Sequence, residues 1–157
     1  MKVIYRKDDE FRKTLFVDRD GTINRDCPYC RRVEDLYIYD DAVDLIRRYE
    51  DREYRIIIVT NQSGIGRGYF SYDEFFRFNG ALVYDLRKRG VIVSATYFCP
   101  HRPEDNCPCR KPGRGLIDEA LSDFRIDMGG SIVIGDREDI DGALANNIGL
   151  PFILLKH

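Results

Sequence analysis

Short apolar runs alternate with longer amphipathic stretches along most of the chain. Apolar residues recur at helical spacing in Ala42–Tyr49, Tyr72–Arg89, Leu116–Phe124 and Ile140–Asn146. The β-rich runs that separate and flank these stretches are Leu15–Val17, Arg55–Val59, Val91–Phe98, Ser131–Ile134 and Phe152–Leu155. Strands joined by crossover helices form a mostly parallel sheet that is covered on both faces. The pattern therefore predicts an α/β fold of three layers.

The helical stretch Tyr72–Arg89 has the clearest boundary signals. Ser71 precedes it and Glu74 follows three residues later, which is the sequence of a capping box. Gly90 comes directly after the stretch and is a typical helix stop. We therefore expect a helix with these borders.

Length and composition are those of one globular domain. The chain has 157 residues, of which 43% are hydrophobic and 33% charged, and it shows no internal repeat, low-complexity tract or linker. We predict a single domain over residues 1–157 with one active site. Residues 1–13 are charged and lack the apolar core of a signal peptide, and no apolar run approaches membrane-spanning length. These features predict a cytoplasmic protein without a membrane partner.

The charge distribution argues against a polymeric anionic partner. The net charge is -2 and the lysines and arginines are scattered along the chain, so no broad basic face is expected. We predict a small-molecule substrate and no nucleic-acid partner. The sequence leaves the oligomeric state open.

A parallel sheet of this kind binds ligands beyond the carboxyl ends of its strands, so the residues directly after each strand are the candidates for a site. Asp18 and Asp20 follow Leu15–Val17, in a turn that Gly21 allows to bend sharply. The alternatives are a turn without function and a calcium loop. The calcium loop is excluded because glycine falls at its fourth position rather than its sixth, and the twelfth position is Tyr29.

Two further strand ends carry polar side chains. Thr60 follows Arg55–Val59 and leads into a loop with three glycines. Such loops let backbone N–H groups approach phosphate, but the same composition is as common in flexible connections. Asp136 follows Ser131–Ile134, where the alternative is an acidic helix N-terminus.

Together with Lys111, from the loop before the next helix, these residues predict phosphoryl transfer. Asp18, Asp20, Thr60 and Asp136 are expected at one edge of the sheet. Two carboxylates and a backbone carbonyl can hold Mg²⁺, which neutralises charge on a phosphate. One carboxylate can then act as the nucleophile, because the metal and the lysine reduce the repulsion between anions.

A cysteine and histidine cluster predicts a structural zinc site. Three thiolates and one imidazole complete a tetrahedral site without an open position, and the spacing C-x-H-x5-C-x-C supplies them from Cys99, His101, Cys107 and Cys109. The alternative is a loop with buried or incidental cysteines. Because Arg110 and Lys111 follow the last ligand, a zinc-stapled loop would hold both cations over the phosphate site.

Cys27 and Cys30 form a second, separate pair. They are spaced like the redox pair of a glutaredoxin, but they lie in a loop after Asp20 rather than at the start of a thioredoxin-type helix. We interpret them as incidental thiols, with a redox or second-metal role as the alternative. The odd total of five cysteines, three of them clustered with a histidine, indicates metal binding in a reducing compartment rather than a secreted disulfide framework.

The motifs resemble those of the haloacid dehalogenase superfamily, in its zinc-containing bisphosphatase and histidinol-phosphatase branch. The resemblance extends from about Thr14 to Leu155, and four motifs match in order: Phe16–Asn24, Thr60–Ile65, Cys109–Pro112 and Gly135–Asp136. The four together are far more specific than any one alone. The resemblance implies a Rossmann-like fold and a phosphatase that uses Mg²⁺ and carries a structural zinc ion.

The resemblance also implies roles for individual residues. Asp18 would attack phosphorus and form an aspartyl-phosphate, while Asp20 would protonate the leaving alkoxide and then take a proton from water. Mg²⁺ would be held by the carboxylates of Asp18 and Asp136 and by the backbone carbonyl of Asp20. Thr60 and Lys111 would hold the phosphoryl oxygens.

Two residues would contact the rest of the substrate, namely Asn61 and Arg110, the latter by gripping another anionic part. The chain departs from the family pattern after Asp136. Many relatives carry a second acidic residue four positions later, whereas here Asp139 lies three and Asp141 five positions later. Which of these two residues supports the site stays open.

Within this branch two activities compete: removal of the 7-phosphate from a heptose 1,7-bisphosphate and hydrolysis of histidinol phosphate. Ile23–Asn24 and Ser63–Gly68 are more similar to the sugar bisphosphatases, so the heptose activity is expected. The polynucleotide 3′-phosphatases share the Thr60–Gln62 region but generally lack the zinc cluster. The alternative from another class is a zinc-stapled binding module without catalysis, but nucleophile, acid and lysine are all present.

Overall fold

A six-stranded sheet forms the centre of the computed structural model, which describes residues 1–157. Its strand order is β1-β4-β3-β2-β5-β6, and only β1 runs antiparallel to its neighbour. The strands are β1 (Lys2–Ile4), β2 (Thr14–Val17), β3 (Arg55–Asn61), β4 (Val93–Cys99), β5 (Ile132–Gly135) and β6 (Phe152–Leu154). The chain order reverses at β2, which lies between β3 and β5. A reversal of this kind opens a crevice at the carboxyl ends of the strands.

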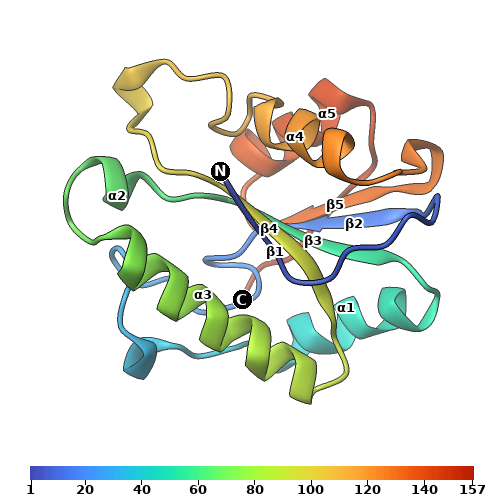
Figure 1. Ribbon diagram of the computed structural model, residues 1–157, viewed down its shortest axis with the longest axis horizontal. Coiled ribbons are helices and arrows are strands. Elements are labelled where there is room, and N and C mark those ends of the chain that lie inside the picture. The colour runs from blue at the N-terminus through green and yellow to red at the C-terminus, as the bar shows by residue number, and fades with distance from the viewer.

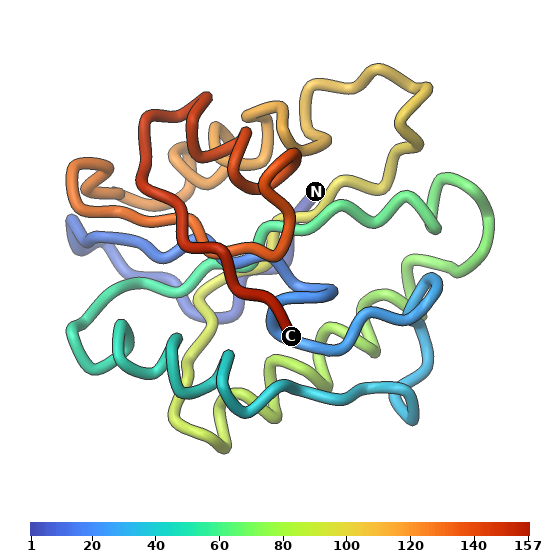
Figure 2. The backbone as a smooth tube through the Cα atoms, turned by 180° about the vertical axis from the view of Figure 1, so that it is seen from behind, coloured from blue at the N-terminus to red at the C-terminus, as the bar shows by residue number.

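Helices cover both faces of the sheet, so the predicted three-layer α/β fold is confirmed. Figure 1 shows α1 and α3 on one face and α4 and α5 on the other, and Figure 2 shows the same layers from behind. The helices are α1 (Asp40–Asp51), α2 (Ser63–Gly66), α3 (Tyr72–Lys88), α4 (Gly115–Asp123) and α5 (Ala143–Ile148). Short 3-10 turns occur at Val33–Asp35, Pro103–Asp105 and Met128–Gly130, and a π turn at Glu138–Gly142 precedes α5.

The apolar runs bury alternate residues on opposite faces of the sheet. Leu15 and Ile56 belong to the hydrophobic core that includes residues of α1 and α3, whereas Phe16 and Ile57 belong to the core beneath α4 and α5. Side chains of a strand alternate between the two faces, and both faces are covered here. The central strands are therefore apolar throughout.

The predicted ends of α3 are confirmed. The Ser71 hydroxyl accepts a hydrogen bond from the Glu74 amide at 3.1 Å, and the Glu74 carboxylate accepts one from the Ser71 amide at 3.0 Å. Gly90 follows the helix with a positive φ of 87°. The capping box and the glycine stop thus act as the sequence indicates.

Three elements differ from the prediction. The short helix α2 lies in the segment after Thr60 where a glycine-containing loop was expected. Strand β1 was not expected, and it pairs with β4 by only three residues, Lys2–Ile4. The predicted helix at Ile140–Asn146 starts within the π turn at Glu138–Gly142, and regular α-helix begins only at Ala143. The other predicted elements are present, with ends displaced by one or two residues in most cases.

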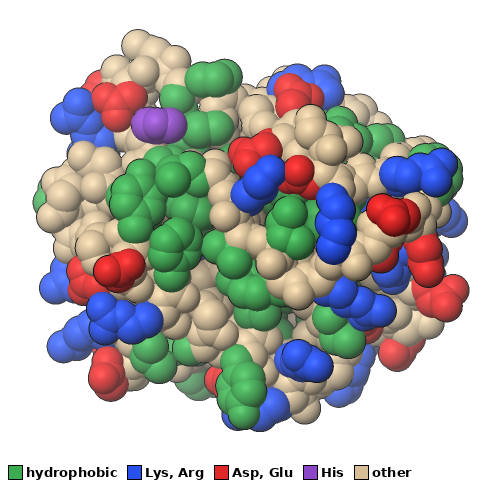
Figure 3. All heavy atoms as spheres, viewed as in Figure 1, with side chains coloured by type: hydrophobic (Ala, Val, Ile, Leu, Met, Phe, Trp, Pro, Cys, Tyr) green, Lys and Arg blue, Asp and Glu red, His purple; other side chains and the backbone are tan.

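The surface mixes charged and apolar side chains. On the face seen in Figure 3, lysines and arginines are interspersed with acidic residues, and hydrophobic side chains also reach the surface. Exposed aromatic residues include Tyr69, Tyr72 and Phe76, at and before the start of α3. None of the helices has the length and hydropathy needed to cross a bilayer.

Candidate active site

The predicted residues meet where β2, β3 and β5 end. A cavity of about 410 Å³ opens at this edge of the sheet. Its floor includes Asp18, directly after β2, Thr60, near the end of β3, and Asp136, directly after β5. Arg110 and Lys111 reach the same cavity from the loop that follows β4. The parallel arrangement of the strands thus brings these side chains together from distant parts of the sequence.

Lys111 lies between two carboxylates in the floor of the cavity. Its Nζ atom donates to Asp18 Oδ1 and to Asp141 Oδ1, both at 2.8 Å, and to the carbonyl oxygen of Val59 at 2.9 Å. All three ammonium donors are therefore satisfied, although the residue is only 2% exposed. Burial lowers the pKa of Lys111, but the charges of Asp18 and Asp141 outweigh burial and raise the pKa above its usual value.

The contacts of Lys111 decide which of the two acidic residues after Asp136, Asp139 or Asp141, supports the lysine. Asp141 is buried against Lys111, and its second oxygen accepts a hydrogen bond from the Arg137 amide at 3.3 Å. Asp139 points to the surface, where it pairs with the Arg137 guanidinium. Asp141, five positions after Asp136, is therefore the residue that contacts the lysine.

Thr22 links the carboxylates of Asp18 and Asp136. Its hydroxyl lies 2.9 Å from Asp18 Oδ2 and 3.1 Å from Asp136 Oδ1. The turn brings the chain close to Asp136, because a Cβ atom at Gly21 would lie 2.5 Å from Asp136 Oδ2, and Gly21 has a φ of 89°. Only glycine fits there without displacement of a carboxylate.

The grouping of these acids suits a hard cation. Carboxylate oxygens of Asp18, Asp136 and Asp141 lie within 4.8 Å of one another. Burial, followed by the hydrogen bond and charge of Asp18, raises the pKa of Asp136 to about 7. A bound divalent cation would relieve this repulsion, and carboxylate oxygens are the ligands that Mg²⁺ prefers. The residues present therefore fit the predicted metal.

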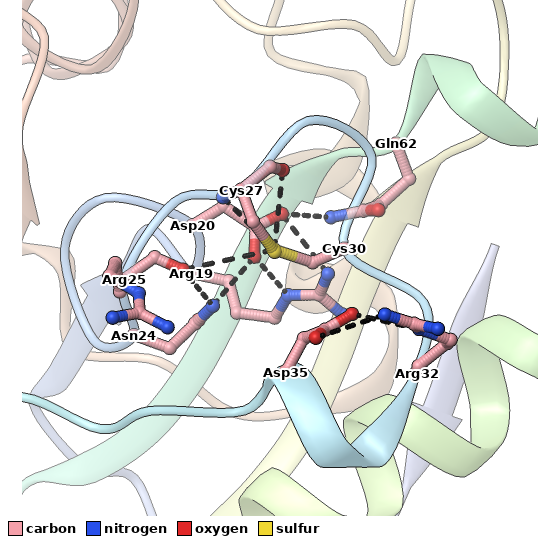
Figure 4. The surroundings of a disulfide bond; sticks show 9 residues. All are labelled: Arg19, Asp20, Asn24, Arg25, Cys27, Cys30, Arg32, Asp35 and Gln62. Carbon is pink, nitrogen blue, oxygen red and sulfur yellow. Dashed lines mark hydrogen bonds and ion pairs between the residues drawn. A yellow bond between two sulfur atoms is a disulfide. The ribbon is translucent and has the colours of Figure 1, made fainter.

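Asp20 is held by four hydrogen bonds (Figure 4). Arg19 donates to both of its oxygens at 3.0 Å, Asn24 donates to Oδ1 at 3.0 Å, and Gln62 donates to Oδ2 at 2.8 Å. Burial raises the pKa of Asp20, but the charge and hydrogen bonds of Arg19, with those of Asn24 and Gln62, outweigh burial and lower the pKa. The carboxylate is therefore both ionised and fixed in orientation at neutral pH.

The end of β3 orients Thr60 and connects the strand to the lysine loop. Gln62 Nε2 donates to Thr60 Oγ1 at 2.9 Å, so the Thr60 hydroxyl keeps its own hydrogen for a ligand. The Asn61 side chain exchanges two hydrogen bonds with the backbone of Lys111, at 2.9 Å and 3.1 Å. Asn61 therefore positions Lys111, while its predicted contact with substrate stays a prediction.

Arg110 has an unused donor next to the cavity. Its Nη1 atom is buried and has no hydrogen-bond partner in the protein. A buried guanidinium donor without an acceptor is costly, and a bound anion would satisfy it. The arrangement is the one predicted for a residue that contacts an anionic part of a ligand.

The predicted zinc ligands converge on one point. The Sγ atom of Cys99 lies 3.0 Å from that of Cys109 and 3.4 Å from that of Cys107, and His101 Nδ1 lies 3.3 Å from Cys109 Sγ. All four donor atoms lie within 4.8 Å of one another. Three sulfurs and one imidazole nitrogen in such a group have the chemistry of a structural zinc site. The residues fit the predicted ion.

Cys27 and Cys30 are joined by a disulfide. The interpretation of these residues as incidental free thiols is therefore wrong. A spacing of three positions allows both a disulfide and two free thiols, so the sequence could not distinguish them. The bond lies in the loop between β2 and α1, and both cysteines line the cavity described above.

The sequence matches a family model and several curated proteins. Residues 108–157 match the model described as HAD-hydrolase-like, where HAD denotes haloacid dehalogenase. A probable D-glycero-D-manno-heptose-1,7-bisphosphate 7-phosphatase of Thermoplasma acidophilum is 65% identical over 157 residues, which cover 100% of this chain and 98% of the relative. The chain belongs to the haloacid dehalogenase-like phosphatases. It is therefore a phosphomonoester hydrolase.

Other relatives agree with the assignment of this chain to the haloacid dehalogenase-like phosphatases. The D-glycero-beta-D-manno-heptose-1,7-bisphosphate 7-phosphatase of Yersinia pestis is 38% identical over 89% of this chain and 79% of its own length. Among solved structures, a putative HAD-like phosphatase from Mesorhizobium loti has a TM-score of 0.86 at 31% identity and covers 95% of this chain and 74% of its own.

The D,D-heptose 1,7-bisphosphate phosphatase from B. bronchiseptica, complexed with magnesium and phosphate, has a TM-score of 0.82 at 28% identity. It covers 90% of this chain and 79% of its own. The predicted family, fold class and phosphatase activity are confirmed.

Sequence reasoning missed three residues that shape the site of the phosphatase. Thr22 links two carboxylates, Gln62 joins Asp20 to Thr60, and Arg19 pairs with Asp20 from a fully buried position. Their proximity to the site in the sequence was the only available signal. Side-chain direction within a turn decides which neighbours of a motif contact it, and a single sequence does not reveal that direction.

Proposed function

We propose that this protein removes the 7-phosphate of a D-glycero-D-manno-heptose 1,7-bisphosphate through an aspartyl-phosphate on Asp18, with bound Mg²⁺. The observation that carries the proposal is the position of Lys111 Nζ, 2.8 Å from Asp18, at a cavity that Lys111, Asp18, Thr60 and Asp136 all line. The names of the most similar relatives support the substrate. The small phosphorylated sugar is the only partner that the proposal requires.

Asp18 is the proposed nucleophile. Its Oδ2 atom accepts a hydrogen bond from Thr22 and its Oδ1 atom one from Lys111, so the carboxylate is held in one orientation at the cavity floor. Mg²⁺, held by the carboxylates of Asp18 and Asp136 and by the backbone carbonyl of Asp20, would neutralise charge on the phosphate. Asp18 then attacks phosphorus in line, and the sugar alkoxide departs.

Asp20 is the proposed general acid and base. It gives a proton to the departing alkoxide and then takes one from the water that hydrolyses the aspartyl-phosphate. Arg19 favours the ionised form of Asp20, but an anionic phosphoryl group that binds beside Asp20 opposes Arg19 and raises the pKa of Asp20. Binding of the substrate therefore helps to protonate the acid.

Two groups hold the transferred phosphoryl group. The Thr60 hydroxyl, oriented by Gln62, donates to one phosphoryl oxygen, and the Lys111 ammonium balances the charge that develops on the others. Asn61 contributes by its two hydrogen bonds to the Lys111 backbone. These contacts fix the phosphoryl group for attack by Asp18.

Arg110 favours a bisphosphate over histidinol phosphate. Its buried Nη1 atom lacks an acceptor, and the second phosphate of a bisphosphate supplies one. Histidinol phosphate carries no second phosphate to supply this acceptor, and a guanidinium would repel the charge of its ammonium group. A structural zinc ion at Cys99, His101, Cys107 and Cys109 would keep Arg110 and Lys111 in place, because both follow the last ligand directly.

The test is release of inorganic phosphate from heptose 1,7-bisphosphate and from histidinol phosphate in the presence of Mg²⁺. The inactive variant is Asp18→Asn, and the matched control is Asp44→Asn, the same change at an exposed position of α1. The proposal expects turnover of the bisphosphate, none by Asp18→Asn and normal turnover by Asp44→Asn. Preference for histidinol phosphate would move the protein to the other activity of its family. An active Asp18→Asn would remove the nucleophile assignment, and release from neither substrate would assign the phosphatase to another phosphorylated metabolite.

A further inference from the structure

One wall of the cavity is built by a loop that contributes no catalytic group. Residues 26–30, in the long connection between β2 and α1, line the cavity together with Asp18 and Thr60 of its floor. Arg110 lines the same cavity from the separate loop that follows β4. A substrate with its phosphate on Asp18 and its other end toward Arg110 would pass along this wall. The wall would therefore contact the sugar, and its position would govern how well the substrate fits.

The wall contains the Cys27–Cys30 disulfide (Figure 4). The bond closes a tight turn in which the Cys30 amide donates to the Cys27 carbonyl oxygen at 3.2 Å. Tyr29, within this turn, has a φ of 52°, a left-handed conformation that a tyrosine rarely adopts. The covalent ring holds a backbone conformation that the open chain would populate less often.

The same turn packs against the segment that follows β3. The ring of Tyr29 lies 4.5 Å, centroid to centroid, from that of Tyr69. It also covers Gly64, where a Cβ atom would lie 2.9 Å from a Tyr29 ring carbon. Just beyond the disulfide, Arg31 donates to the Tyr69 carbonyl oxygen at 2.9 Å. The wall is thus held in place by the turn conformation on one side and by contacts with α2 and its neighbouring loop on the other.

We propose that the Cys27–Cys30 disulfide is a redox-sensitive clamp that determines substrate affinity: the oxidised form holds the wall of the cavity, and reduction releases it. The inference rests on the proposed function for the identity of the substrate, but not for the behaviour of the loop. Asp18 and Lys111 are bonded to each other, and Asp20 is bonded to Gln62, all outside residues 26–30, so these catalytic groups are expected to keep their positions in both forms. Reduction therefore raises KM and leaves the chemical step unchanged.

The reaction is a two-electron exchange with a dithiol. A thiolate of the dithiol attacks Cys27 Sγ, because Cys27 is partly exposed whereas Cys30 is only 4% exposed. The Cys27–Cys30 bond breaks, and Cys30 leaves as a thiolate that takes up a proton. The second thiol of the dithiol then attacks the mixed disulfide, releases the Cys27 thiol and completes the oxidation of the dithiol to its own disulfide.

The clamp acts locally rather than on the whole fold. The two cysteines are separated by only 3 positions, and a disulfide that closes so short a loop removes little entropy from the unfolded chain. Neither cysteine belongs to a helix or a strand. Opening the bond therefore changes the wall while the sheet and the cavity floor stay in place.

The experiment compares wild type, oxidised with glutathione disulfide or reduced with dithiothreitol, with the double variant Cys27→Ser/Cys30→Ser under both conditions. Phosphate release is measured from heptose 1,7-bisphosphate and from acetyl phosphate, which is too small to reach the wall. Reduction is expected to raise KM for the bisphosphate about tenfold, because the substrate must then order the loop. The kcat for the bisphosphate and all constants for acetyl phosphate should stay the same.

A second measurement reports on the loop without any substrate. Arg25 and Arg31 flank the disulfide and are exposed, so limited trypsin treatment followed by mass spectrometry gives the cleavage rate at both. Cleavage should be faster in the reduced protein and in the double variant than in the oxidised protein. This measurement decides whether reduction releases the wall even if the oxidised wild type hydrolyses neither substrate, an outcome that would refute the proposed function alone.

Three outcomes would overturn the clamp. The first is an equal cleavage rate, or an equal KM for the bisphosphate, in the oxidised and reduced wild type. The second is the absence of a Cys27–Cys30 bond after oxidation. The third is an equal response of the double variant to dithiothreitol, which would assign the effect to the other three cysteines. A double variant that keeps the reduced-state KM under both conditions would support the clamp.

Discussion

Removal of the Asp141 carboxylate tests the account of the buried lysine. Lys111 Nζ lies 2.8 Å from Asp141 Oδ1, and the two side chains are 2% and 3% exposed. At this distance and an effective dielectric constant of about 20, the attraction between two unit charges is about 6 kcal/mol before desolvation is counted. Asp18 still pairs with Lys111 after the change, so what is lost is one of two buried charge partners, which typically costs about 1–3 kcal/mol. We expect Asp141→Ala to lower the free energy of unfolding by that amount.

The assay is urea unfolding followed by far-ultraviolet circular dichroism, since the chain has no tryptophan. The matched control is Asp139→Ala, two residues away, where the side chain is 67% exposed and pairs only with the surface residue Arg137. The control should change stability by less than about 0.5 kcal/mol. Equal effects of the two variants, or an effect of Asp141→Ala below about 1 kcal/mol, would refute the reasoning.

The isosteric variant separates the charge of Asp141 from its shape. Asp141→Asn keeps an oxygen acceptor for Lys111 but removes the charge, so it should be more stable than Asp141→Ala and still lower kcat. The predicted Mg²⁺ ligands are Asp18, Asp136 and the carbonyl of Asp20, whereas Asp141 is predicted to act on Lys111, to which it is bonded at 2.8 Å. The Mg²⁺ concentration for half-maximal activity should therefore stay unchanged. A large rise in that concentration would instead make Asp141 a metal ligand.

The pKa of Asp136, raised to about 7, implies that the folded protein binds an extra proton between about pH 4 and pH 7, so without Mg²⁺ its stability should fall as pH rises through that range. Urea midpoints at about pH 5 and pH 8 should show this slope, and Asp136→Asn should abolish it. Gly80→Ala places a methyl group in the interior of α3 with no atom within 4 Å, so it should stabilise the protein by about 0.5–1 kcal/mol in the same urea assay. Cys109→Ser removes one of four predicted zinc ligands, and metal analysis of the purified variant should find far less zinc than in wild type, whereas Cys27→Ser should keep it.

The sequence predicted the parts of the site that depend on strand order. Asp18, Thr60 and Asp136 each stand at the end of a strand with a clear apolar run, and parallel strands end at a common edge. The cysteine and histidine cluster could also be predicted, because its four residues lie close together in the sequence, from Cys99 at the end of β4 to Cys109 in the loop that follows. Strand β1 was not predicted, because a strand of three residues at the edge of the sheet can pair with β4 without an alternating apolar pattern.

The choice between Asp139 and Asp141 could not be made from the sequence, because it depends on the type of turn. The segment Glu138–Gly142 winds as a π turn, in which the Arg137 carbonyl accepts hydrogen bonds from the Asp141 and Gly142 amides at 2.8 Å and 3.2 Å. The wider turn directs Asp141 inward and leaves Asp139 at the surface. Helical periodicity alone assumes 3.6 residues per turn and does not anticipate this widening.

The balance of charge in the cavity explains why a proton and a metal ion should compete for the same residue. Arg19 compensates Asp20, and Lys111 lies between Asp18 and a second buried carboxylate, so one cation serves two anions there. Asp136 adds another negative charge with only a hydroxyl donor beside it. Without a metal ion, a proton neutralises the charge of Asp136 most readily, and the pKa of Asp136 therefore rises to about 7. A divalent cation must displace that proton, so its affinity should weaken as pH falls below about 7.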